Sequence, residues 1–234
     1  GGFEHFQRRM GLEDAHTLGL DSPFNYPEQA MLCVPRYLPE PNSFSMRETL
    51  LNTAKRLIKA SKGRCFLLFT SHAMLREIAG KLEDEIDNPL LVQGTTTKQA
   101  LLDAYIADEK AVLLGTGAFW EGVDVRGNDL VCVMIDKLPF ASPDDPLLQA
   151  RMEDVKKRGA NPFAVIQIPQ AVIALKQGAG RLIRDPLDKG VLVICDNRLV
   201  TKPYAKTFIG SLPDMKRTRS LDEVEAFLAN IDEE

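Results

Sequence analysis

The sequence predicts an α/β fold in which helices flank a mostly parallel sheet. Short apolar runs, β-branched in part, alternate along the chain with segments of helical periodicity, as expected of strands joined by helical crossovers. With 234 residues and 44% hydrophobic content, the chain can bury a full core. It contains no internal repeat and no low-complexity tract. A single domain over residues 1–234 is therefore expected.

The apolar runs predict six strands. Their ranges are 29–34, 64–69, 90–93, 111–114, 130–135 and 191–195. Two proline-rich stretches interrupt this series. Residues 22–42 are expected to form an irregular lead-in that contributes one strand, and residues 139–146 are expected to begin a surface excursion.

Helical patterns lie between the expected strands. They predict helices at 46–60, 71–85, 144–158, 169–184 and 220–230, with a further helix after residue 96. Several have residues typical of a helix start, namely Ser71, Thr96 with Gln99, Pro169, and Ser220 with Glu223.

Charge and hydropathy exclude some classes of function. The 29 Lys and Arg residues against 33 Asp and Glu give a net charge of −4, so any nucleic-acid contact needs a local basic strip. No apolar run approaches the roughly 20 residues that span a bilayer, and no basic-then-apolar signal segment opens the chain. No membrane partner is expected.

The cysteines occur singly inside apolar runs, at Cys33, Cys65, Cys132 and Cys195. They lack the Cys-x-x-Cys spacing by which one loop presents two ligands to a metal. We therefore expect small buried hydrophobic residues and no metal site, and a cytoplasmic protein. The three histidines have no carboxylate or cysteine pattern around them and are assigned no chemistry.

The octet QGAGRLIR ends the helical pattern that begins at residue 169. On a helix, Arg181 and Arg184 would lie on one face. Guanidinium groups held in this way suit the charge on a transferring phosphoryl group. Gly178 and Gly180 would allow close backbone approach, with Gln177 as a hydrogen-bonding partner. The alternative is a surface helix end with favourable C-terminal cations.

This octet also resembles motif VI of superfamily 2 helicases, in the Gln-x-x-Gly-Arg-x-Ile-Arg form of the DinG and XPD family. Other segments resemble further motifs of that family in the same order. FLLFTS at 66–71 resembles motif IV, GTGAFWEGVD at 115–124 resembles motif V, and DKLPF at 136–140 resembles the link to motif VI. The resemblance covers nearly the whole chain and is strongest to the YoaA-like branch.

The resemblance implies a RecA-like second motor lobe of the P-loop NTPase type. The sequence contains no Gly-x-x-x-x-Gly-Lys-Ser/Thr loop and no Asp-Glu-Ala-His-type box. The family has both, with an iron–sulfur cluster, in its first lobe. Residues 1–45 are then the lead-in from the first lobe plus one strand, and 46–234 the core. ATP and Mg²⁺ would act in the full-length protein, and this fragment alone would bind no cofactor and be inactive.

Residue roles follow from the resemblance. Arg181 and Arg184 would be arginine fingers at the γ-phosphate of ATP held by the absent lobe, with Gln177 beside them. The other implied ATP-binding residues are Gly178, Gly180, Glu121 and Asp124. The implied DNA-binding residues are Thr70, Ser71, Gly115, Thr116, Gly117 and Trp120. Ser71 could equally be only a helix cap, and Trp120 could pack under its loop rather than stack on a base.

The implied function is that of an ATP-dependent 5′–3′ DNA helicase in DNA repair or replication. Its partners would be single-stranded DNA, the N-terminal lobe and a replication or repair accessory protein. A nucleic-acid or protein-binding module without catalysis is the alternative. A dinucleotide-dependent (NAD) oxidoreductase is more remote: Gly115-x-Gly117 follows a strand and Asp136 ends the next, but Trp120 replaces the third glycine of that motif.

Overall fold

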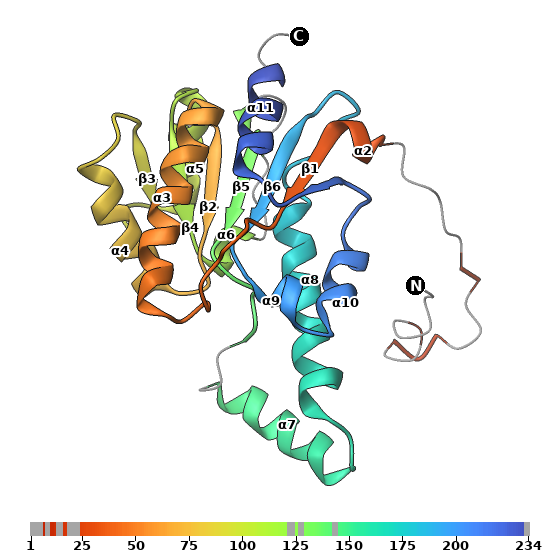
Figure 1. Ribbon diagram of the computed structural model, residues 1–234. Coiled ribbons are helices and arrows are strands. Elements are labelled where there is room, and N and C mark those ends of the chain that lie inside the picture. The colour runs from red at the N-terminus through yellow and green to blue at the C-terminus, as the bar shows by residue number, and fades with distance from the viewer. Residues whose placement is uncertain are drawn as a thin grey trace.

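The computed structural model contains a seven-stranded, all-parallel sheet with helices on both faces (Figure 1). It describes residues 7, 10–12, 16–17, 24–120, 125, 129–141 and 145–231, and only the backbone of residues 118 and 120. The strands are β1 (Ala30–Cys33), β2 (Cys65–Leu68), β3 (Leu90–Val92), β4 (Val112–Gly115), β5 (Cys132–Ile135), β6 (Gly190–Ile194) and β7 (Lys216–Thr218). Their order is β3-β4-β2-β5-β6-β1-β7. The predicted fold class and all six predicted strands are confirmed.

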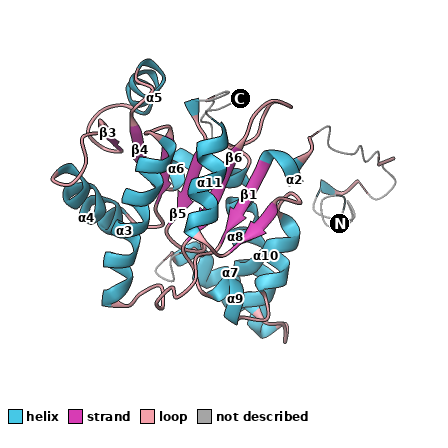
Figure 2. Ribbon diagram, turned by 45° about the horizontal axis from the view of Figure 1, so that its top comes forward, coloured by secondary structure: helices cyan, strands magenta, loops and turns pink. Residues whose placement is uncertain are grey.

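The helices are α2 (Tyr26–Gln29), α3 (Phe44–Ser61), α4 (His72–Glu83), α5 (Lys98–Ala107), α6 (Gly117–Trp120), α7 (Pro146–Lys157), α8 (Ile168–Ala179), α9 (Arg198–Thr201), α10 (Ala205–Ser211) and α11 (Leu221–Ile231). A π-helix, Phe163–Gln167, precedes α8. Helix α3 packs against both α4 and α11 on one face of the sheet, and α8 packs against α10 on the other (Figure 2). This division follows from right-handed crossovers, because the chain moves in one direction along the sheet from β1 to β3 and then returns.

The core lies in the central strands. Every residue of β1, β2, β4, β5 and β6 is buried, because helices cover both faces of these strands. The strand β7 was not predicted from the sequence. Its three residues, Lys216–Thr218, are polar and largely exposed at the sheet edge, so they form no apolar run.

Two predictions about helix ends were wrong. The helix expected to reach residue 184 ends at Ala179, with Gly180 as its C-cap, so Arg181 and Arg184 do not lie on a helix face. The chain must turn there to enter β6. The cap of α5 is Thr97 rather than Thr96, since the Thr97 hydroxyl accepts from the Ala100 amide.

Other helix starts agree with the sequence. Ser71 caps α4 by accepting from the Met74 amide at 3.2 Å, and Ser220 accepts from the Glu223 amide at 3.4 Å. Asp145 caps α7. Among the described residues, no helix has the length and apolar character needed to cross a bilayer.

The four cysteines are buried thiols, as predicted. Burial raises the pKa of the Cys33 thiol to about 12 and raises the pKa of Cys195 well above its ordinary value. A hydrogen bond with Cys65, together with burial, raises the pKa of Cys132 in the same direction. Within the described ranges, no group of three or more His, Cys, Asp or Glu side chains is arranged to hold a metal ion.

Candidate functional site

The predicted DNA-contacting residues meet at one end of the sheet. Because all seven strands are parallel, every segment that follows a strand lies at the same end. Thr70 and Ser71 follow β2, and Gly115–Gly117 closes β4 and opens α6. Strand β2 lies between β4 and β5, so these segments are neighbours. We call this end of the sheet the carboxyl edge.

Thr116 is held by a neighbouring loop. Its backbone amide and its hydroxyl both donate to Gln93 Oε1, the hydroxyl at 3.0 Å. The His72 Nε2 atom lies 3.4 Å from the same hydroxyl oxygen. The amide and hydroxyl donors of Thr116, which could have faced a phosphate, are therefore occupied within the lobe. Thr116 thereby orders the loop between β4 and α6.

Gly115 and Gly117 differ in their steric need for glycine. A Cβ at Gly115 would come within 2.7 Å of the Phe119 Cβ, because the buried Phe119 folds back under the strand end. A Cβ at Gly117 would meet nothing within 4 Å. Only Gly115 is required to be glycine by its described surroundings.

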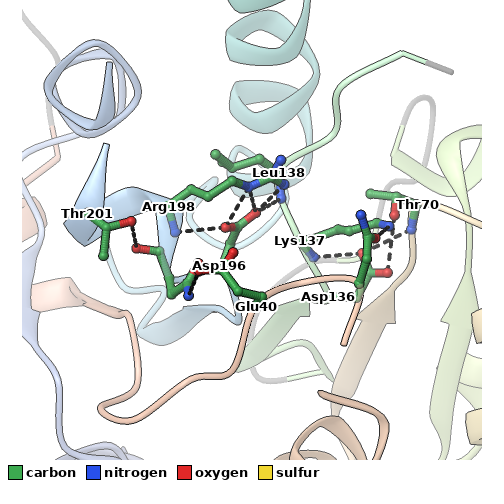
Figure 3. A network of polar contacts seen from close by, with 10 residues as sticks. Glu40, Thr70, Asp136, Lys137, Leu138, Asp196, Arg198 and Thr201 are labelled. Carbon is green, nitrogen blue, oxygen red and sulfur yellow. Dashed lines mark hydrogen bonds and ion pairs between the residues drawn. The ribbon is translucent and has the colours of Figure 1, made fainter. Parts of the chain in front are cut away.

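Thr70 is hydrogen-bonded to Asp136, the residue that follows the neighbouring strand β5. Its amide and hydroxyl donate to the two carboxylate oxygens of Asp136, at 3.0 and 3.2 Å, and the Lys137 amide donates to Asp136 Oδ1 at 2.8 Å (Figure 3). Asp136 is only 3% exposed. Burial raises the pKa of its carboxyl to about 7, opposed by the Lys137 charge and these hydrogen bonds.

Asp196 repeats this arrangement one strand further along. It is fully buried just after β6, and its Oδ2 accepts from the Leu138 amide at 2.8 Å. Arg198 forms an ion pair with it, with the terminal guanidinium nitrogen 2.6 Å from Oδ2 (Figure 3). The Arg198 guanidinium also lies over the Phe140 ring. Sequence reasoning missed Asp196 and Arg198, although an Asp directly after an apolar strand was the available signal.

The lead-in loop also reaches the carboxyl edge. Lys137 Nζ donates to Asn42 Oδ1 at 3.0 Å, and Asn197 Nδ2 donates to Glu40 Oε1 at 3.1 Å. Ser71 differs from its neighbours because it is exposed and its oxygen only accepts, from the Met74 amide in the first turn of α4. Within the part of the chain that the structure describes, no acceptor is recorded for its hydroxyl proton.

The described members of the predicted nucleotide-contacting set lie at the opposite end of the sheet. The loop of residues 180–189 joins α8 to the start of β6, so it belongs to the amino end of the strands. We call it the arginine loop. Strand β6 spans five residues, which separates the two ends by roughly 16 Å along the strand. The structure therefore does not bring the two predicted sets together.

Arg181 and Arg184 are half-buried within the arginine loop. Burial lowers the pKa of Arg184, partly offset by the nearby Asp188 carboxylate. Gln177 is half-buried and Gly178 fully buried near the end of α8. At Gly180, a Cβ would lie 3.1 Å from the Lys176 carbonyl oxygen.

Three predicted residues cannot be placed. Glu121 and Asp124 lie outside the described residues, and Trp120 is described only as the last backbone position of α6. The dinucleotide alternative finds little support here. The Asp136 carboxylate, which would have to bind the ribose, is taken up by Thr70 and Lys137.

Residues 54–215 match the family described as Helicase C-terminal domain. The chain therefore belongs to the helicase C-terminal domains of the DinG/XPD family, which confirms the resemblance read from its motifs.

Curated relatives match nearly all of the chain. It is 53% identical over 230 residues to the ATP-dependent DNA helicase YoaA of Haemophilus influenzae, covering 98% of this chain and 36% of that protein. It is 36% identical to the ATP-dependent helicase DinG of Mycobacterium tuberculosis, covering 99% of this chain and 35% of that protein. The chain thus spans about a third of the length of these relatives.

Solved structures agree on the fold. Xpd4 of S. tokodaii superposes with a TM-score of 0.61 at 19% identity, over 88% of this chain and 41% of that one. Dbp5 of S. cerevisiae, bound to RNA and ADP BeF3, gives 0.59 at 15% identity, over 97% of this chain and 51% of that one. At this level of identity, the likeness shows a RecA-like helicase lobe as the fold.

The raised pKa of Asp136 makes a prediction about stability. Well below pH 3.8 both the folded and the unfolded state hold the proton. As the pH rises, the unfolded chain releases it near 3.8 and the folded chain at about 7. The stability contributed by protonated Asp136 is therefore lost as pH rises from about 4 to about 7. Asp136→Asn, which keeps an acceptor for both amides, should flatten this part of the stability profile. Urea unfolding from pH 4.5 to 8 measures it, and parallel profiles for the two proteins would contradict it.

Proposed function

We propose that this chain is the second motor lobe of an ATP-dependent DNA helicase. The arginine loop acts on ATP held by a first lobe, and the carboxyl edge contacts single-stranded DNA. The observation that carries the proposal is the separation of two half-buried arginines from a polar edge at the other end of the sheet. The absence of a phosphate-binding loop from the sequence and the names of the relatives support it.

The arginines act by electrostatic stabilisation. Half-burial strengthens the field of Arg181 and Arg184 at a facing phosphate, because less water screens the two guanidinium groups. Mg²⁺ and the phosphate-binding loop would come from the first lobe, as would an iron–sulfur cluster. Contact with the γ-phosphate exists only when the lobes close, so ATP favours closure and hydrolysis releases it.

The carboxyl edge grips DNA through an ordered framework. Thr70 and Thr116 use their donors within the lobe, so they fix the shape of the edge. Ser71 can donate to a phosphate while it caps α4, because capping uses only its oxygen as an acceptor. The N-terminal amides of α4, a helix of 12 residues, favour an anion at the same place. Alternating grip by two lobes gives translocation, with 5′–3′ polarity proposed from the family resemblance.

The arginine role predicts a large kinetic effect. In the intact helicase that contains this chain, Arg181→Ala or Arg184→Ala should lower DNA-stimulated ATP hydrolysis by roughly a thousandfold, as for other arginine fingers. The chain alone should hydrolyse no ATP with or without DNA.

A coupled ATPase assay with matched thermal melting measures both effects. Arg217→Ala, which removes an arginine that is 60% exposed on β7, is the control and should keep normal turnover. Robust hydrolysis by the chain alone would show a complete active site and end the half-motor proposal. Normal turnover with early melting of either arginine variant would make that arginine structural.

Ser71 allows its two roles to be separated. Ser71→Asp should keep the cap of α4, because Asp is an equally good N-cap, but it loses the hydroxyl donor and adds a negative charge. Ser71→Ala should lose about 1 kcal/mol of stability by losing the cap. If Ser71 contacts DNA, the Asp variant should bind single-stranded DNA more weakly than the Ala variant while unfolding at higher urea.

Fluorescence anisotropy with a labelled oligonucleotide at several salt concentrations gives the affinities. Wild-type binding should weaken as salt rises, because phosphates are being neutralised. Equal affinity for wild type and both variants would assign Ser71 to helix capping alone.

A further inference from the structure

Two buried polar side chains hold the arginine loop. They are Asp188, within the loop, and Gln29, at the end of α2. Each is 5% exposed. Burying such groups is unfavourable unless they form hydrogen bonds, so their contacts show what they hold in place.

Asp188 fixes the backbone at Arg184. Its Oδ2 atom accepts from the backbone amides of Arg184 and Asp185, both at 2.8 Å. Charged acceptors make stronger hydrogen bonds than neutral ones. The same carboxylate favours the charged form of the Arg184 guanidinium against the effect of burial. Asp188 therefore acts on both the position and the charge of one predicted finger.

Gln29 holds the other side of the loop. Its Nε2 donates to the carbonyl oxygens of Asp185, Pro186 and Asp188, at 3.1, 2.9 and 3.0 Å. Three acceptors around one amide nitrogen set the orientation of the side chain, because a flipped amide would put its oxygen against three carbonyls.

The Gln29 side chain is kept at a cost. Its Oε1 atom is buried with no hydrogen-bond partner in the described structure. Burying an oxygen without a partner destabilises the fold, because the lost hydrogen bonds to water are not replaced. An apolar side chain would avoid this cost. The advantage of glutamine at this position is therefore the set of hydrogen bonds by which Nε2 holds the loop.

The position of Gln29 connects the loop to the chain's lead-in. Gln29 directly precedes β1, whose Ala30 pairs with Gly190 at the start of β6. The segment that enters the sheet at β1 and the loop that enters it at β6 thus run side by side. In the family resemblance, this segment comes from the first lobe.

We propose that Gln29 and Asp188 are positioning residues for Arg184, and that Gln29 makes the placement of this arginine depend on the segment arriving from the first lobe. This inference rests on the proposed function. Neither residue would contact the nucleotide. Both would set the distance between the guanidinium and the γ-phosphate, to which the rate is highly sensitive.

The geometry can be tested without any activity. In this protein, Asp188→Ala should raise the hydrogen-exchange rates of the Arg184 and Asp185 amides at least tenfold, because both lose their acceptor. Asp188→Asn keeps an acceptor oxygen and should stay close to wild type. Asp214→Ala, an exposed aspartate outside the loop, is the control and should change neither amide. Unchanged exchange in Asp188→Ala would overturn the clamp.

The positioning role is tested in the intact helicase by a double-mutant cycle. Asp188→Ala should lower kcat for ATP by roughly tenfold to a hundredfold with unchanged affinity for single-stranded DNA. Asp188→Asn should recover most of the rate. In the double variant, Asp188→Ala should lower the rate no further than Arg184→Ala alone, because the arginine that Asp188 positions is already gone. Gln29→Met, which keeps the volume but not the hydrogen bonds, should also lower kcat.

The outcomes separate two failures. If Arg184→Ala keeps normal turnover, the proposed function of the loop is wrong. If Arg184→Ala loses turnover but Asp188→Ala and Gln29→Met do not, or if their effects multiply with that of Arg184→Ala, the arginine acts and the positioning proposal is wrong.

Discussion

The parallel register of the sheet is the constraint on which the rest of the structure depends. Strand β1 is hydrogen-bonded to both β6 and β7 in the same direction, and the other four strands continue that direction. Segments that follow strands are thereby collected at one end, and segments that precede them at the other. A lobe built in this way can hold two unlike chemical environments apart with one rigid core between them.

Buried carboxylates order both ends. At the carboxyl edge, Asp136 and Asp196 accept backbone amides from neighbouring loops, and at the other end Asp188 does the same for the arginine loop. Burying a carboxylate costs free energy unless several donors surround it. The loops are therefore fixed by hydrogen bonds to buried carboxyl oxygens where the strands themselves can no longer pair.

Much of this fold could be predicted from the sequence, because fully buried parallel strands read as apolar runs. The polar edge strand β7 gave no such signal. Arg181 and Arg184 were predicted as site residues from residue type, spacing and the motif resemblance, and this role stays a prediction. Their predicted helical placement was wrong because Gly180 ends α8. Gln29 was missed because its partner Asp188 lies 159 residues away, and a contact of that separation depends on the pairing of β1 with β6.

The central claim is that single-stranded DNA and ATP contact opposite ends of the sheet. Hydrogen exchange of the intact helicase tests this claim directly. Exchange would be compared for the protein alone, with single-stranded DNA, and with a non-hydrolysable ATP analogue. We expect DNA to protect residues 70–74 and 115–117, and the analogue to protect residues 181–189. Protection of the same end by both ligands, or of residues 181–189 by DNA alone, would contradict the account.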